Sequence, residues 1–153
     1  MNGRAFQKFL ATGEYVPTMD SAENPGAEFK EKWKAVPQNA PIRPDIKRII
    51  EECQLQPDEH LRQDSLSLMN LFSTDGHFIV ELSGGTNGSP DERKILAYLA
   101  VVRKFCKKML DENVAERIWL IDWKNDCADD VWYARLAFKT KPDPKEKENA
   151  PEH

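Results

Sequence analysis

A change in hydrophobic periodicity near residue 64 constrains this chain more than any other feature of its sequence. Beyond it, apolar and polar residues alternate in two runs, 65–72 and 77–83, on either side of an Asp75-Gly76 pair. A period of two indicates a strand, and Asp-Gly between two such runs indicates a hairpin. Two more alternating runs, "RIWLIDW" and "VWYARLAF", flank the loop "KNDCADD". The sequence therefore predicts two β-hairpins.

A long helical pattern, from about Pro90 to Glu112, separates the hairpins. Its broad apolar face carries Ile95, Leu96, Tyr98, Leu99, Val101, Val102, Phe105, Cys106, Met109 and Leu110. A shorter helix after Pro44 has its own apolar stripe of Ile46, Ile49, Ile50 and Cys53, and another short turn is expected near Pro57. We expect an α+β fold: an N-terminal helix followed by β-β-α-β-β, with the long helix packed on one face of a mainly antiparallel sheet.

The glycine-rich stretch "LSGGTNGSPDERK", residues 82–94, lies between a predicted strand and the long helix, where phosphate-binding loops also lie. It lacks the Gly-Lys-Ser/Thr end of a P-loop and the G-x-G-x-x-G spacing of a dinucleotide site. Ser89, Pro90 and Glu92 instead match a capping box, in which Ser and Glu side chains satisfy free backbone N–H groups. We interpret the stretch as a strand-to-helix turn.

Prolines and charge divide the chain into three parts. Residues 1–42 are predicted to be an irregular arm with short amphipathic segments, including one with Phe6, Phe9 and Leu10 on one side and Gly13 at its end. Residues 43–140 are the predicted compact α+β domain, and residues 141–153 a disordered charged tail.

Composition narrows the class of protein. The formal net charge of −4 disfavours non-specific wrapping of duplex nucleic acid. The apolar runs are too short to span a bilayer, and the N-terminus lacks the apolar core of a secretory signal, so we expect a cytoplasmic protein, with a nuclear one left open. Three cysteines, Cys53, Cys106 and Cys127, are an odd number, widely spaced and without a CxxC pair, which argues against a disulfide framework and a structural zinc site. We assign no catalytic residue, cofactor or metal ligand.

Apolar residues on both faces of the predicted strands suggest that each face is covered. We expect the helix around Ile46–Cys53 to cover the second face, with a partner or a second copy as the alternative. Alternation also places Trp119, Ile121 and Trp123 on one face, where the indoles would lie under the long helix or stack on a flat ligand.

The β-β-α-β-β order with tryptophans on the sheet resembles the mRNA cap-binding initiation factors, in element order alone. Four cations, Arg103, Lys104, Lys107 and Lys108, lie on the polar side of the long helix. Such residues hold phosphates in nucleic-acid-binding proteins, and they also complement the negative end of a helix. Together with Trp119 and Trp123, they form our candidate ligand- or RNA-binding residues.

The segment "FKEKWKAV" places Phe29, Trp33 and Val36 along one side of a helix, the spacing of helix-in-groove recognition. It is similar to the F-x-x-x-W-x-x-L anchor of tumour-suppressor transactivation peptides, with Val in place of Leu and lysines in place of acidic neighbours. These are our candidate partner-binding residues, and the anchors would dock on this chain, on a second copy or on another protein.

Three functions follow. The first is a non-enzymatic protein-interaction module of the adaptor, chaperone-like, inhibitor or immunity type, whose partner is another protein or a second copy in a homodimer. The second is a ligand or single-stranded RNA binder of the mRNA-cap type. The third is a small divalent-metal-dependent enzyme using Asp122, Asp126 and Asp130, because hard cations prefer oxygen ligands. We expect no membrane partner.

Overall fold

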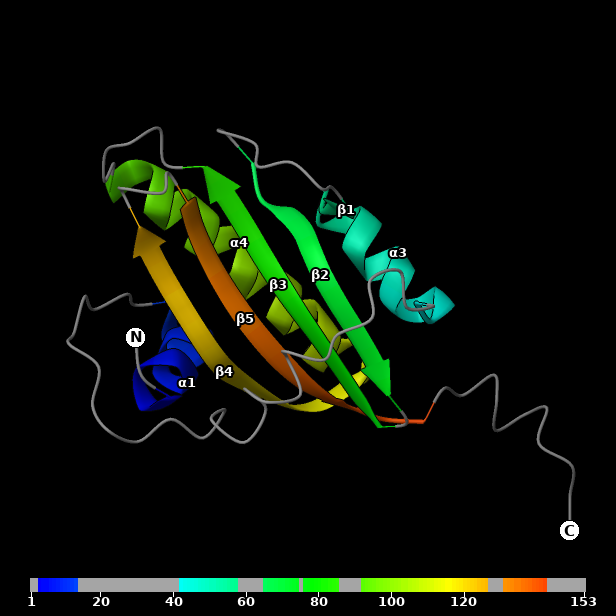
Figure 1. The fold of residues 1–153 in the computed structure, drawn as a ribbon. Helices are drawn as coiled ribbons and strands as arrows, with labels where there is room; N and C mark the ends of the chain where they lie inside the picture. Colours follow the sequence, from blue (N-terminus) through cyan, green and yellow to red (C-terminus); the bar gives the residue numbers. More distant parts are fainter. Residues whose placement is uncertain are drawn as a thin grey trace, which may run out of the picture.

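The sheet in Figure 1 belongs to a computed structural model that describes residues 3–13, 42–57, 65–74, 76–85, 92–126 and 131–142. Within these residues the helices are α1 (Gly3–Thr12), α3 (Pro44–Glu52) and α4 (Glu92–Asp111). The strands are β1 (Gln56–Pro57), β2 (Ser67–Thr74), β3 (His77–Gly85), β4 (Ala115–Asp126) and β5 (Val131–Thr140). They form one sheet in the order β1-β2-β3-β5-β4.

Both predicted hairpins are present. Strands β2 and β3 pair antiparallel up to Thr74 and His77, and Gly76 between them has a φ of +92°. Strands β4 and β5 also pair antiparallel, and β3 joins the two hairpins by pairing antiparallel with β5. The predicted α+β class with a mainly antiparallel sheet is therefore confirmed.

The first two residues of the short turn expected near Pro57 form a strand instead, and the rest of that turn, residues 58–63, lies outside the described residues. Gln56 and Pro57 form β1, which pairs parallel with β2 at the edge of the sheet. Proline lacks the N–H that an inner strand needs, so an edge is the position in a sheet where it is tolerated. The preceding Leu55 is buried in the core and fixes the chain against the sheet at this point.

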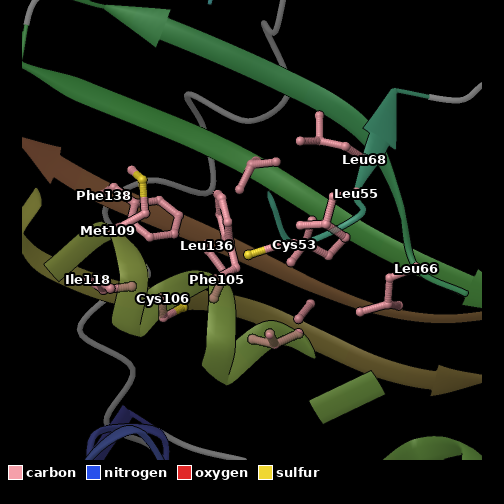
Figure 2. Packing of buried hydrophobic residues seen from close by; sticks show 14 of the residues in the cluster. Cys53, Leu55, Leu66, Leu68, Phe105, Cys106, Met109, Ile118, Leu136 and Phe138 are labelled. Atoms are coloured by element: carbon pink, nitrogen blue, oxygen red, sulfur yellow. The ribbon is translucent and has the colours of Figure 1, made fainter. Parts of the chain in front are cut away.

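The main core lies between one face of the sheet and all three helices. In Figure 1, α4 runs behind the sheet, α1 lies near β4, and α3 lies beside β1 and β2. Figure 2 shows Phe105, Cys106 and Met109 of α4 near Leu136 and Phe138 of β5. The rings of Phe105 and Phe138 meet edge to face, with centroids 5.4 Å apart. Burial of side chains of this size contributes about 1.5–3 kcal/mol each.

Helix α3 does not cover the second face of the sheet, so that expectation is wrong. Ile46, Ile49 and Ile50 enter the same main core as α4. The second face has a small cluster of its own, Ile79, Trp119, Ile121 and Ala137. Apolar alternation indicates that both faces are covered, but it does not specify which helix lies on which face, and that ambiguity produced the error.

The first two glycines of the glycine-rich stretch lie inside β3 rather than in a turn. A Cβ atom on Gly84 would be 2.6 Å from the ring of Tyr98 on α4, and the Tyr98 hydroxyl donates a hydrogen bond of 2.8 Å to the Gly85 carbonyl. Gly84 thus allows the start of α4 to pack closely on the sheet. Ser89 and Pro90 of the predicted capping box lie outside the described residues.

Candidate functional site

An open groove of about 430 Å³ lies between the end of α1 and one side of α4. Its apolar lining consists of Phe9, Leu96, Leu99 and Ala100. Its charged lining consists of Arg103, Lys104, Lys107 and Lys108, with Asp111 at the far end. Among the lining residues that the structure describes, four cations thus face one carboxylate, in a chain whose formal net charge is −4.

The α1 side of the groove is held in place by apolar burial and by hydrogen bonds to neighbouring elements. Phe6, Phe9 and Leu10 are buried in the main core, as their spacing predicts. The Gln7 side-chain amide donates to the Ile118 carbonyl at 2.7 Å, which ties α1 to β4. Gly13, at a φ of +79°, ends the helix by donating its N–H to the Phe9 carbonyl at 2.8 Å.

Arg103 joins the two helices that form the groove. Its Nε donates to the Leu10 carbonyl at 3.2 Å, in the last turn of α1. A Cβ atom added to Gly13 would lie 3.3 Å from the centre of the Arg103 guanidinium. A cation at the C-terminal end of a helix stabilises the free carbonyls there. Arg103 is therefore part of the structure of the groove as well as of its charge.

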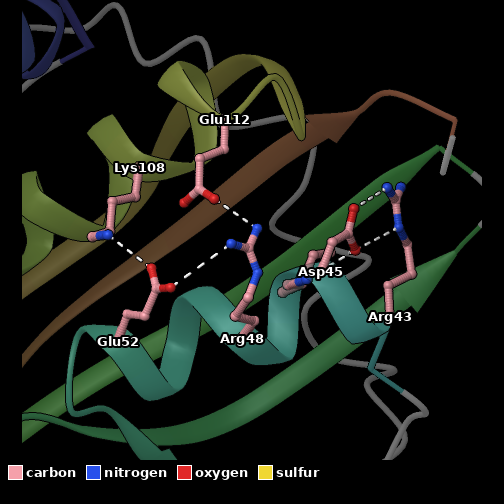
Figure 3. Close-up of polar contacts among 7 residues, drawn as sticks. Arg43, Asp45, Arg48, Glu52, Lys108 and Glu112 are labelled. Carbon is pink, nitrogen blue, oxygen red and sulfur yellow. Dashed lines mark hydrogen bonds and ion pairs between the residues drawn. The ribbon is translucent and has the colours of Figure 1, made fainter.

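The opposite flank of α4 faces α3 and is closed by ion pairs, which Figure 3 shows. Arg48 of α3 lies 2.6 Å from the Glu112 carboxylate, and Lys108 of α4 donates to the Glu52 carboxylate at 2.8 Å. The hydrogen bond from Lys108 lowers the pKa of Glu52 below its ordinary value, and the same bond raises the pKa of Lys108. Lys108 therefore belongs to both flanks.

The four cations predicted from the sequence do come together along the groove, although nothing in the structure tests whether they bind a ligand. Lys104 is exposed and Lys107 half-buried, and neither forms an ion pair within the part of the chain that the structure describes. Arg103 and Lys108 have the partners given above. Among the described residues, two of the four cations thus have a partner within the fold, and the other two, Lys104 and Lys107, have no ion pair.

Trp119 and Trp123 lie on opposite faces of the sheet, so the expectation that they share a face is wrong. The register of β4 against β5 shifts between Leu120 and Asp122, where Ile121 is an extra residue. A bulge of this kind reverses the alternation beyond it. Trp119 lies in the second-face cluster, with the guanidinium of Arg117 4.9 Å from its ring centroid. Trp123 packs against the main core beside Phe6 and Trp132.

The remaining candidate residues are not tested by the described structure. Phe29, Trp33, Val36 and Asp130 lie outside the described residues. Asp122 and Asp126 belong to β4, but their side chains are not among those described. Among the side chains that are described, no group of three His, Cys, Asp or Glu residues could hold a metal ion. No helix in the same part of the chain has the length and apolarity to cross a membrane.

The two described cysteines are buried, as their helical positions indicate. Cys53 of the α3 end and Cys106 of α4 both lie in the main core. Burial raises the pKa of both thiols, because the charged thiolate loses its hydration. A thiol is nucleophilic as its thiolate, so neither cysteine has the environment of a reactive one.

Sequence reasoning missed the groove lining outside the cation cluster, namely Phe9, Gly13 and Leu96. Leu96 was assigned to the buried face of α4, but 43% of it is exposed. Its sequence position carried a signal, since Leu96 precedes Ala100, Arg103 and Lys107 at helical spacing on the polar side. Phe9 and Gly13 carried no such signal, because only the tertiary fold brings α1 beside α4.

Comparison of the chain with protein-family models, with curated proteins and with solved structures gave no match.

Proposed function

We propose that this protein is a non-enzymatic protein-interaction module and that the groove between α1 and α4 is its docking surface. The observation that carries the proposal is Leu96, a large apolar side chain that lines the groove on the same helix as the four cations and is left 43% exposed. Apolar anchors within a polar rim are characteristic of protein–protein contact surfaces. An adaptor, chaperone-like, inhibitor or immunity protein would each use such a surface.

The groove supports this function better than a base-stacking function. The two sheet tryptophans are on opposite faces, so they do not form one platform with the cations. Among the described lining residues the aromatic one is Phe9, which is only 3% exposed and offers almost no surface for stacking. The cations alone would still attract phosphates, so the experiment must distinguish binding of a protein from binding of nucleic acid.

Site-specific photo-crosslinking in the native cells tests the proposal. Leu96 is replaced by p-benzoylphenylalanine in the full chain, and Lys47, exposed on α3 outside the groove, receives the same probe as the matched control. We expect a discrete protein adduct from position 96 that is absent from position 47. The adduct should disappear when Lys104→Glu and Lys107→Glu are introduced together.

An adduct twice the size of the chain would identify the partner as a second copy and would also support an interaction function. Either of two results would overturn the proposal: equal adducts from positions 96 and 47, or an adduct from position 96 that nuclease removes. Far-ultraviolet circular dichroism of each variant verifies that the loss of an adduct reflects the surface and not unfolding.

A further inference from the structure

We infer that the occupant of the groove is an acidic amphipathic helix of a partner protein; this inference rests on the proposed function and names the chemistry of the partner. Three features of the groove support it: its length, the placement of its apolar and charged lining, and which of its cations already have a partner in the described fold. The partner would place an aliphatic ridge against Leu96 and a row of carboxylates against Lys104 and Lys107.

The groove is long enough along α4 for a helix to lie in it. Its lining on α4 runs from Leu96 to Asp111, which is about 22 Å along the helix axis at 1.5 Å per residue. The end of α1 forms the other wall. Two neighbouring helices leave a furrow into which the side-chain ridge of a third helix packs, the same geometry that joins helices within a protein. A partner helix of about four turns would fill it.

The lining separates into an apolar part and a charged part along α4. Leu96, Leu99 and Ala100 lie toward the start of α4, and the cations lie from Arg103 onward. Leu99 and Phe9 are nearly buried, so Leu96 is the side chain whose apolar surface a partner would remove from water. An aliphatic ridge on the partner would meet Leu96, while its acidic residues would continue over the cations.

The charge of the groove selects an acidic partner. Lys104 and Lys107 form no ion pair with any residue that the structure describes, whereas Lys108 is paired with Glu52 and Arg103 with the Leu10 carbonyl. A partner carboxylate would therefore meet Lys104 and Lys107 without displacing an ion pair to any residue that the structure describes. Opposite potentials across an interface accelerate association and reject partners of the wrong sign.

A designed peptide tests the inference on the full chain. The probe is a fluorescein-labelled peptide of about 18 residues in which Leu and Glu recur at helical spacing, so that one side is aliphatic and the other acidic. Its comparison peptides have the same composition in scrambled order, or Lys at every Glu position. Oligouridylate of similar charge is the nucleic-acid probe, and fluorescence anisotropy measures each affinity at low and high salt.

We expect the ordered acidic peptide to bind about tenfold more tightly than the scrambled one, and to weaken about tenfold from low to high salt because exposed charges are screened. The Lys peptide should not bind. Lys104→Glu with Lys107→Glu should lower the affinity about tenfold or more, since attraction becomes repulsion. Leu96→Ala should lower it about fivefold through lost apolar burial.

Lys47→Glu is the matched control, because it reverses one exposed charge on α3 outside the groove, and it should change the affinity less than twofold. Equal binding of the ordered and scrambled peptides would overturn the inference. So would tighter binding of oligouridylate that is lost with Lys104→Glu and Lys107→Glu, which would assign the cations to phosphates.

The two experiments fail separately. A specific protein crosslink at position 96 without peptide binding would leave the interaction function in place and reject the acidic helix. Peptide binding in the groove without any cellular protein crosslink would reject the interaction function, and with it the assignment of a partner helix. Only the combination of a specific crosslink and selective acidic-peptide binding supports both.

Discussion

The two flanks of α4 carry similar cations, which form ion pairs with described residues on one flank and not on the other. On the α3 flank, Lys108 meets Glu52 and Arg48 meets Glu112, so the charges are neutralised within the chain. On the α1 flank, Lys104 and Lys107 form no ion pair with a described residue, and Leu96 is exposed beside them. Helix α4 supplies cations to both sides, but of its two neighbours α1 and α3 only α3 supplies a carboxylate in return, that of Glu52.

This difference shows that a run of basic residues on a helix need not be a single surface. The four cations lie within a span of six residues, yet Arg103 and Lys108 bond to neighbouring helices while Lys104 and Lys107 form no ion pair with a described residue. A function is better sought where a charge lacks an internal partner than where charges are most numerous. The following predictions test whether the two flanks differ in this way.

The largest expected effect concerns the closed flank. Ile49 of α3 is fully buried in the main core. Ile49→Ala should lower the free energy of unfolding by about 2–5 kcal/mol, from lost apolar burial and the cavity that remains. On the open flank, Leu96→Ala should lower it by less than about 1 kcal/mol, because much of that side chain is already in water. Urea denaturation followed by circular dichroism measures both.

Lys47→Ala on α3 is the control for Ile49→Ala, since it removes an exposed side chain from the same helix and should change stability by less than about 0.5 kcal/mol. If Leu96→Ala proved as costly as Ile49→Ala, then Leu96 would be a core residue, and the open flank would have no exposed apolar anchor.

A smaller effect is expected where α1 ends at the open flank. Gly13→Ala should lower the free energy of unfolding by about 1–2 kcal/mol, because a left-handed φ of +79° is unfavourable for a residue with a Cβ. The new Cβ would also lie 3.3 Å from the Arg103 guanidinium, which would have to move. Thermal denaturation of the full chain measures the loss.

Gly76→Ala separates these two causes. Gly76 also has a positive φ, but a Cβ there would meet no atom within 4 Å. Gly13→Ala should lower the free energy of unfolding more than Gly76→Ala does, and the difference measures the contact with Arg103. This difference should be smaller when Arg103 is also replaced by Ala. An excess that persists without the Arg103 side chain would mean that this residue does not hold the wall of the groove.

Much of the fold was predictable because it depends on local patterns. Alternation around Asp75-Gly76 specified the first hairpin, and the spacing of Phe6, Phe9 and Leu10 specified the apolar side of α1. The fate of Trp123 was not predictable, because one extra residue at Ile121 places it on the face opposite to the one that a strict period of two assigns. Nothing in the local sequence marks that bulge.

The candidate site was predictable only in part, and for a related reason. The cations stand close together in sequence, and one helix is enough to align them. The groove also needs α1, and the pairing of Lys108 needs Glu52, which is 56 residues away in the chain. Which cations are neutralised is a property of the tertiary structure. A sequence pattern therefore shows which residues are charged, but not which of them are ion-paired.

The smallest expected effect is electrostatic, and it tests whether the charges of the two flanks are separate. The hydrogen bond from Lys108 lowers the pKa of Glu52 below its ordinary 4.5, against a smaller opposing effect of burial. A carboxyl group with a depressed pKa in the folded state contributes stability above pH 4.5 and loses it as the pH falls through the lower folded value. The pKa of Lys108 is raised above 10.5. Lys108 therefore contributes stability to the folded state below pH 10.5, and this contribution is lost as the pH rises through its higher folded pKa.

Carbon-detected NMR titration of the Glu52 carboxyl group should therefore give a midpoint below 4.5, and Lys108→Met should move it upward. Lys104→Met should move it less, because Lys104 acts on Glu52 only at a distance, without a hydrogen bond. Glu116, whose pKa is lowered by its own bond to Lys139, should keep its midpoint in both variants. Equal shifts from Lys104→Met and Lys108→Met would mean that Lys104 is already committed to α3, and a partner's carboxylates would then have to compete with Glu52 for it.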